Sequence, residues 1–447
     1  MHNYLAILHE DFQMRKIITL FLLLSIVPCV FAGDAVDENE LFGDPDGGIE
    51  PRQEATADAA GLEKTTRLSG EITSAVIHSE VNASTSSQLA AYVLGNLFLD
   101  VRLKNDIKAM VNLEASYIGS SKTTLVNIRE FFFDFNIRRK AYFRTGKQVL
   151  QWGRCYFWNP TDLLNVEKKS FVQKIGYREG AYGIKAHIPF GTQYNIYGFI
   201  DTGNAQESRD AAVAGKFEFL AGNTEMAFAG WGKRGFPAAL GYDLSTRMFG
   251  IDTLAEVSAS PGDISPGMRE DANTLYLNRS GEWTSKAAVS LGRSFDMGDI
   301  NDRFSIISEF FYNQAGYDGD PFNDSATYNF AQPAVLTSAA GTLLVTSGTK
   351  KDFLLYNNLY ETHYFSKYYS AIFASIRRFI ITDMTLNLNY IRNLSDSSGI
   401  ISAGVQYKDI NDFSYSLLFN SYVGNPNREY TFSNTTLTAQ LTAGISF

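Results

Sequence analysis

Thr436-Leu437-Thr438-Ala439-Gln440-Leu441-Thr442-Ala443-Gly444-Ile445-Ser446-Phe447 ends this 447-residue chain and alternates without interruption. Every odd position from Leu437 to Phe447 is apolar, and every even position is small or polar. Because successive side chains of a β-strand point to opposite faces, this stretch predicts a strand with one apolar side and one water-facing side. Such a strand suits a wall between lipid and water, and it also suits a two-faced sheet in a soluble domain.

The terminal phenylalanine separates these two interpretations. A last strand with a final aromatic residue and apolar residues at alternate positions resembles the sorting signal of bacterial outer-membrane β-barrels. This resemblance assigns the signal to Leu437, Leu441, Ala443, Ile445 and Phe447. It implies that the protein resides in the bacterial outer membrane of a Gram-negative cell, with outer-membrane lipid and the barrel assembly machinery as partners.

The start of the chain has the pattern of a secretory leader. Met14-Arg15-Lys16 precedes an apolar run over 17–27, and small residues precede Gly33. This pattern predicts a signal peptide at 1–32, with Met14 as the true start because Glu10 and Asp11 are unusual in a leader. A membrane anchor is the alternative, although a spanning helix needs about 20 apolar residues.

The chain contains two cysteines, Cys29 and Cys155. Cys29 lies in the leader, where lipid modification is a minor alternative because Pro28 fits lipoprotein processing poorly. After cleavage only Cys155 remains, so the mature chain is expected to form no internal disulfide.

The composition fits a membrane protein that crosses with strands. Past residue 32 no apolar run is long enough for a transmembrane helix. A barrel escapes that test because only every second residue faces lipid. The aromatic share of 14%, with 33 Phe and 24 Tyr, suits the girdles of a barrel. The net charge of −9 argues against nucleic acid as a partner.

Two segments follow the leader. Residues 33–65 are rich in Asp and Glu and poor in apolar side chains, which predicts a flexible acidic periplasmic arm. Residues 66–447 read as consecutive strands separated by turns. In 107–117, for example, apolar residues at odd positions alternate with Lys108, Asn112 and Glu114. Lipid on one side and a watery lumen on the other explain both sets.

These patterns predict an all-β fold, a single transmembrane antiparallel β-barrel of about 18 strands, with 16 or 20 as alternatives. The segments that read as strands, 353–365 among them, are odd in number, whereas bacterial single-chain barrels use an even number. We expect the error to lie in a split around 236–257 or in a missed strand near 335–345.

The third external connection, about 150–176, is the most unusual segment. Gly146-Lys147-Gln148, Trp152-Gly153 and Asn159-Pro160-Thr161-Asp162 together resemble a motif of uncharacterised porin-like outer-membrane families. The resemblance implies a third loop that folds into the lumen and narrows it. Opposed charges in such a passage set ion and solute preference. The candidates at this constriction are Glu130, Asp134, Arg144, Arg154, Asp162, Lys168 and Lys169.

In this arrangement Arg154, Asp162 and the two lysines would face Arg144, Glu130 and Asp134 across the constriction. The alternative is that Trp152, Phe157 and Trp158 only pack the loop onto the barrel rim, with a turn at Asn159-Pro160.

No metal, cofactor or enzymatic activity is expected. Asp318, Asp320 and Asp324 offer oxygen ligands for Ca²⁺, but no bidentate Glu follows them. His78, His187 and His363 lie in no recognisable cluster with a nucleophile.

We therefore expect an outer-membrane porin-like channel for passive diffusion of small hydrophilic solutes or ions. The alternative is an adhesin or polysaccharide-associated barrel with a blocked lumen.

Overall fold

The computed structural model describes residues 65–81, 87–103, 106–165, 180–203, 205–338, 341–409 and 412–447. The expected signal peptide at 1–32, Cys29 and the acidic arm at 33–65, apart from Thr65, lie outside the described residues. Within the described ranges, no helix has the length and apolarity that a membrane-crossing helix requires.

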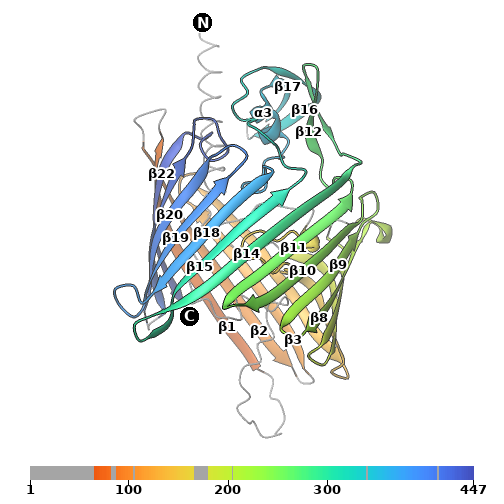
Figure 1. Ribbon diagram of the computed structural model, residues 1–447, viewed down its shortest axis with the longest axis vertical. Coiled ribbons are helices and arrows are strands. Elements are labelled where there is room, and N and C mark those ends of the chain that lie inside the picture. Colours follow the sequence, from red (N-terminus) through yellow and green to blue (C-terminus); the bar gives the residue numbers. More distant parts are fainter. Residues whose placement is uncertain are drawn as a thin grey trace.

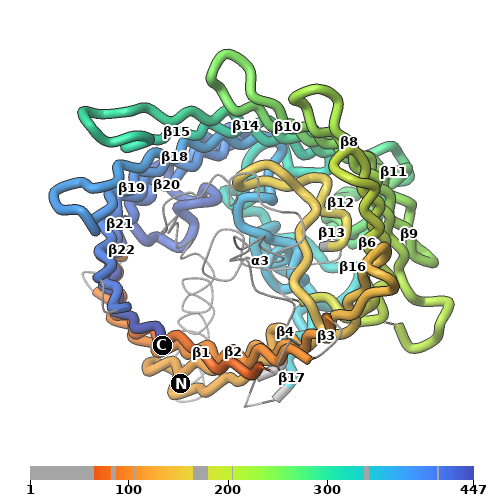
Figure 2. The backbone as a smooth tube through the Cα atoms, turned by 90° about the horizontal axis from the view of Figure 1, so that it is seen from below, coloured from red at the N-terminus to blue at the C-terminus, as the bar shows by residue number. Residues whose placement is uncertain are grey.

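Eighteen strands form one closed antiparallel sheet (Figures 1 and 2). Each strand pairs with the barrel strand before it in the chain, and β22 pairs with β1 to close the ring. The predicted fold class and strand number are confirmed. The barrel strands are β1 (Thr65–Val81), β2 (Ser87–Leu103), β3 (Ile107–Ile118), β4 (Thr123–Ile137), β5 (Ala141–Gln148), β6 (Ala181–Phe190), β7 (Tyr194–Asp201), β8 (Ala212–Ala221), β9 (Thr224–Gly232), β10 (Ala239–Met248), β11 (Ile251–Pro261), β14 (Trp283–Met297), β15 (Ile300–Asn313), β18 (Tyr368–Arg377), β19 (Met384–Asn393), β20 (Gly399–Lys408), β21 (Phe413–Val423) and β22 (Thr435–Ser446).

A second, smaller sheet lies at the end of the barrel that carries the long connections, beside the short helix α3 (Figure 1). Its order is β12-β13-β16-β17. These elements are β12 (Gly267–Asp271), β13 (Thr274–Asn278), β16 (Tyr328–Ser338), β17 (Gly341–Gly348) and α3 (Lys350–Tyr356), and the remaining helical turns are the 3-10 helices η1 (Leu163–Asn165) and η2 (Ser208–Asp210).

The strand expected at 353–365 is wrong, because its first part is helix α3. Thr349 caps this helix: its side chain accepts a hydrogen bond from Asp352 N, and Asp352 accepts one from Thr349 N at 2.9 Å. Phe353 and Leu354 are both fully buried, although they are neighbours in sequence. In a two-faced strand only one of two neighbouring side chains would be buried.

The two segments in which we expected the error in the strand number do not contain it. Residues 236–257 do contain two barrel strands, β10 and β11. The apolar stretch near 335–345 does form strands, β16 and β17, but they belong to the smaller sheet and not to the barrel. Removing 353–365 alone therefore brings the barrel to its even number.

The alternation of the opening stretch is visible in β22. Leu441 is 59% exposed on the outer face, whereas its neighbour Gln440 is 2% exposed and faces inward. Exposed apolar side chains recur around the ring, for example Phe131 on β4, Phe228 on β9 and Ile401 on β20. Since these side chains all lie on the outer surface, the barrel presents an apolar exterior suited to lipid.

Candidate constriction site

The described first part of the connection between β5 and β6, residues 149–165, enters the barrel and runs inside the ring of strands (Figure 2). It contains Trp152 and Trp158, which are 1% and 0% exposed. Trp158 stacks on Phe311 of β15 with ring centroids 5.5 Å apart, and its Nε1 donates to the carbonyl of His363 at 2.9 Å. These aromatic residues pack the loop against the inner wall.

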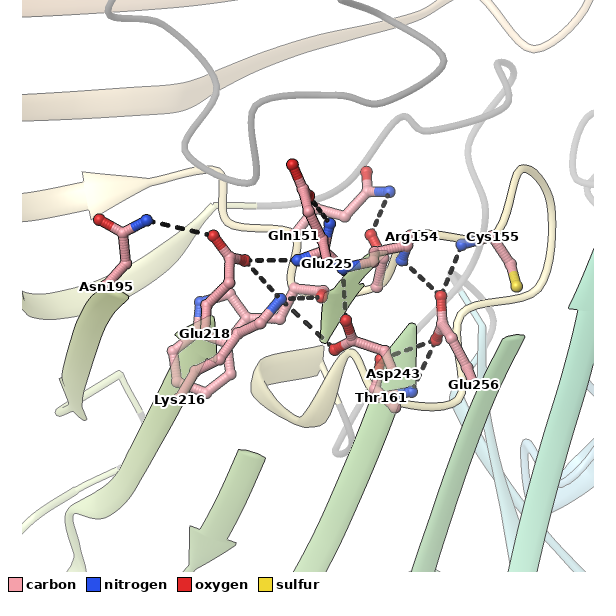
Figure 3. A network of polar contacts seen from close by, with 12 residues as sticks. Gln151, Arg154, Cys155, Thr161, Asn195, Lys216, Glu218, Glu225, Asp243 and Glu256 are labelled. Atoms are coloured by element: carbon pink, nitrogen blue, oxygen red, sulfur yellow. Dashed lines mark hydrogen bonds and ion pairs between the residues drawn. The ribbon is translucent and has the colours of Figure 1, made fainter. Parts of the chain in front are cut away.

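Glu256 of β11 holds the middle of this loop. Its Oε1 accepts hydrogen bonds from the backbone N–H groups of Arg154 and Cys155, the latter at 2.6 Å. Its Oε2 accepts from Thr161 N at 3.0 Å and Thr161 Oγ1 at 2.7 Å. One wall carboxylate therefore satisfies four donors from two parts of the loop (Figure 3).

Glu309 of β15 plays the same role for the next residues. It accepts from the backbone N–H groups of Tyr156 at 3.0 Å, Phe157 at 3.2 Å and Trp158 at 2.6 Å. Three successive N–H groups that converge on one anion form a concave anion-binding arrangement of the backbone. Glu309 is 2% exposed, so these charge-assisted hydrogen bonds are shielded from water.

Arg154 extends from the loop to the wall formed by β8, β9 and β10 (Figure 3). Its guanidinium contacts Glu218 at 2.6 Å and also pairs with Glu225 and Asp243. Burial alone would lower the pKa of Arg154, but the three carboxylates raise it above its ordinary value. Arg154 therefore stays charged.

Lys216 of β8 completes this network. Its ammonium lies 3.4 Å from Asp243 and 3.7 Å from Glu218, and it donates to the carbonyl of Trp152 at 2.9 Å. Lys216 therefore links the loop backbone to the same carboxylates that bind Arg154, and the loop is held at both ends of its described inward segment.

That Arg154 and Asp162 face Arg144, Glu130 and Asp134 across a constriction stays a prediction. The described candidates have the following partners. Arg144 binds Asp134 on the neighbouring strand, with Nε–Oδ1 at 2.7 Å and Nη2–Oδ2 at 3.0 Å. Glu130 accepts from Val149 N at 3.0 Å, where the loop leaves the wall. The ion-pair partners of Arg154 are Glu218, Glu225 and Asp243, which lie on other strands.

The remaining constriction candidates are placed as follows. Asp162 is 6% exposed, and its N–H donates to Asn159 O at 3.1 Å in the turn expected at Asn159-Pro160. Lys168 and Lys169 lie outside the described residues.

The three aspartates considered for Ca²⁺ each pair with a different cation. Asp318 lies 3.5 Å from Lys367, and Asp324 lies 2.9 Å from Lys350. Asp320 pairs with Arg428. In the part of the chain that the structure describes, no group of three or more His, Cys, Asp or Glu side chains is arranged to hold a metal ion.

The histidines are dispersed. His78 lies on β1, and His187 on β6 contacts Asn195 Oδ1 at 3.1 Å. His363 is fully buried in the connection before β18, with Nδ1 2.7 Å from the hydroxyl of Tyr430. Burial lowers the pKa of His363 to about 3, so this imidazole is neutral.

A third buried carboxylate ties other long connections together. Glu429, in the connection between β21 and β22, accepts from His363 N at 3.1 Å, Tyr369 OH at 2.8 Å and Asn393 Nδ2 at 2.7 Å. Its own N–H donates to Asp396 at 2.7 Å. Burial, followed by the nearby Asp396, raises the pKa of Glu429 to about 8.

The wall residues that position the loop were not among the sequence candidates. Their one sequence signal is a charged side chain at a lumen-facing position of an alternating strand. These residues are Lys216, Glu218, Glu225, Asp243, Glu256 and Glu309.

No protein-family model and no curated protein sequence matches this chain. Solved structures match its fold. OccAB1 of Acinetobacter baumannii matches with a TM-score of 0.50 and 11% identity, over 86% of this chain and 96% of that chain. OccK2 (OpdF) of Pseudomonas aeruginosa matches with a TM-score of 0.50 and 10% identity, over 86% of this chain and 97% of that chain. Both are outer-membrane porins, and at this identity the likeness concerns the fold.

Proposed function

We propose that this protein is a porin-like channel of the bacterial outer membrane, through which small hydrophilic solutes or ions diffuse passively. The observation that carries the proposal is a closed barrel in which the connection between β5 and β6 is fixed inside the lumen by Glu256 and Glu309. On this proposal a loop held in this way narrows the lumen while it stays fixed to the wall. The solved barrels with this fold are porins, which agrees with this function.

The two faces of the wall support the same proposal. The outer face exposes apolar side chains such as Leu441 and Phe131. The inner face carries Arg144, Lys216 and Glu218, charged groups that suit a water-filled passage. On this proposal the loop narrows the lumen, and the charges around Arg154, which lie where the loop meets the wall, set the preference for ions.

The route to the membrane is part of the proposal. The leader at 1–32 would direct export, and Leu437, Leu441, Ala443, Ile445 and Phe447 would address the chain to the barrel assembly machinery. In β22 these residues share the outer face of the wall, where a partner that receives the last strand has access to them.

One observation favours a second candidate, a surface-binding barrel with a blocked lumen. The sheet β12-β13-β16-β17 adds a folded unit at the end of the barrel where the long connections gather. It exposes Val335, Leu343 and Leu344 at 58%, 53% and 62%. A channel does not require such a surface, whereas an adhesin does.

Conductance separates the two candidates. Purified protein in planar bilayers should give discrete current steps if it is a channel. Protein that inserts, as judged by its protection from protease in vesicles, yet gives no steps would instead support the surface-binding barrel.

A further inference from the structure

One sector of the inner wall differs in chemistry from the rest. Along β19, β20, β21 and β22, the lumen-facing positions from 385 to 393, 400 to 406, 414 to 422 and 438 to 442 hold no Asp, Glu, Lys or Arg. The sector that holds the loop, from β8 to β15, carries instead the charges around Arg154 and the two anchoring glutamates. The two sectors lie on different sides of the ring (Figure 2).

We define the amide strip as six lumen-facing side chains that cross these strands: Asn387, Asn389, Ser402, Asn420, Thr438 and Gln440. Their positions are in register. Asn389 lies opposite Ser402, Ser402 opposite Asn420, and Asn420 opposite Thr438. The pairing of the strands therefore places amides and hydroxyls side by side across the wall.

Part of the amide strip is already hydrogen-bonded. Ser402 Oγ donates to Asn420 Oδ1 at 2.7 Å, and Asn420 Nδ2 donates to Thr438 Oγ1 at 3.1 Å. This chain fixes the orientation of the Asn420 amide, since one of its groups donates and the other accepts. These three side chains therefore form an ordered polar surface, and they have lost conformational freedom before any solute arrives.

The other end of the strip has unused hydrogen-bonding capacity. Asn387 is 2% exposed, and neither its Oδ1 nor its Nδ2 has a partner in the part of the chain that the structure describes. Asn389, two residues along the same strand, is 6% exposed, and its Nδ2 likewise has no partner there. Buried amide groups without hydrogen-bond partners raise the free energy of the protein. This surface therefore favours a solute that supplies both donors and acceptors.

We propose that the amide strip binds an uncharged polyhydroxylated solute, such as a sugar or a polyol, during its passage. Each hydroxyl both donates and accepts, and neighbouring hydroxyls match the donor and acceptor of one amide. Asn387 and Asn389 are separated by roughly 7 Å along the strand, which is comparable to the width of one sugar ring. The six side chains of the strip carry no charge, so they offer a charged solute no ion pair.

This inference rests on the proposed channel function, and the test keeps the two apart. Single-channel current in KCl reports the channel itself. Glucose, added at rising concentration, reports the strip, because a bound sugar obstructs the ion current. We expect glucose to reduce the current of the wild type, and N387A to raise the half-inhibitory concentration roughly tenfold, the effect of about one lost hydrogen-bonding group.

N112A is the matched control. Asn112 is also a buried lumen-facing asparagine with an unpartnered Oδ1, but it lies on β3 outside the strip. This variant should leave the inhibition by glucose unchanged. If N387A does not insert, N389A on the same strand tests the same prediction.

Three results would overturn the inference: no effect of glucose on a conducting wild type, unchanged inhibition in N387A, or an equal loss in N112A. If the wild type gives no current at all, the channel proposal fails. Saturation-transfer NMR with glucose and detergent-solubilised protein then tests the strip independently. A transfer signal that N387A abolishes would support the inference, and no signal in the wild type would overturn it.

Discussion

Gly70 of β1 and the carboxyl-terminal Phe447 hydrogen-bond to each other in both directions. Gly70 N donates to Phe447 O at 2.8 Å, and Phe447 N donates to Gly70 O at 2.9 Å. A Cβ atom at Gly70 would lie 2.5 Å from Phe447 Cζ, so the phenyl ring covers the space that the glycine leaves open. The last residue of the chain therefore contributes to the closure of the barrel.

A side chain at Gly70 should weaken this closure. G70V is expected to displace the Phe447 ring and to lower barrel stability by about 1–3 kcal/mol, the usual cost of overpacking. The midpoint of heat-induced unfolding, read from the shift in gel migration, measures the loss. Because the ring is the obstacle, F447A should cost less in the G70V background than in the wild type. Equal costs in both backgrounds would show that the ring and the glycine act independently.

Deletion of Phe447 tests its proposed role as a sorting signal. We expect less inserted protein in the membrane fraction, whereas the ion selectivity of the protein that does insert should match that of the wild type. Ion selectivity should be unchanged because Phe447 is 60% exposed on the outer surface and does not face the lumen. A changed selectivity with normal insertion would reverse this assignment.

The alternation of polar and apolar residues predicted the strands of the barrel, because this alternation involves only residues that are neighbours in the chain. It predicted the fold class, the strand number and an unusual third connection. It failed at 353–365, where adjacent buried residues, Phe353 and Leu354, belong to a short capped helix. An alternating pattern and a short helix with both neighbours buried are hard to separate over so few residues.

The sequence did not predict which wall residues hydrogen-bond to the loop. Cys155 and Glu256 are 101 residues apart, and Trp158 and Glu309 are 151 apart. Nothing in a strand indicates which loop its lumen-facing carboxylate will meet. The sequence candidates Arg144 and Asp134 do pair, but with each other, because they face one another on neighbouring strands.

Removal of the Arg154 charge should shift ion selectivity towards cations. In R154A the three carboxylates of Glu218, Glu225 and Asp243 lose their guanidinium partner. Among the described ion pairs of this network, Lys216 is then the remaining cation. One unit charge about 7 Å away changes the energy of a passing cation by ~0.6 kcal/mol in water and that of an anion by the same amount with opposite sign, so the cation-to-anion permeability ratio should rise roughly sevenfold. The reversal potential in a KCl gradient measures this ratio.

R154K separates charge from geometry, because it keeps the charge and loses the planar guanidinium. It should retain most of the wild-type selectivity. R139A serves as the control for a general loss of charge, since Arg139 is exposed in a short turn and pairs with Asp106. If R154A and R139A shift the reversal potential equally, Arg154 does not line the selective part of the passage.

Glu309 should control how firmly the loop narrows the lumen. E309A leaves the N–H groups of Tyr156, Phe157 and Trp158 without their acceptor, which costs on the order of 3 kcal/mol. We expect the loop to leave the wall part of the time, giving a larger and noisier single-channel current. E309Q keeps one acceptor oxygen and should lie between E309A and the wild type. A single-channel current in E309A with the amplitude and noise of the wild type would mean that Glu309 does not fix the position of the loop in the lumen.

The cluster around Glu429 should loosen as pH rises. The pKa of Glu429 is raised to about 8 in the cluster and returns to its ordinary value near 4.5 when the cluster opens. Between these values the closed form binds the extra proton, so its stability falls from pH 4.5 to pH 8 and levels off above. His363 acts in the opposite direction below pH 6.5: its pKa of about 3 in the cluster returns to its ordinary value near 6.5 when the cluster opens, so its contribution to the stability of the closed form rises up to about pH 6.5 and then levels off. The loosening caused by Glu429 is therefore isolated between pH 6.5 and pH 8.

Trypsin reports this opening, since Arg428 lies beside Glu429 in the same connection and pairs with Asp320. Cleavage after Arg428, normalised to a peptide of the same sequence at each pH, should be faster at pH 8 than at pH 7, a range above the ordinary pKa of His363. E429Q, a neutral mimic of the protonated acid, should remove that difference. If the normalised rate in the wild type is independent of pH, or if E429Q keeps the wild-type slope, Glu429 is not the group that couples the cluster to pH.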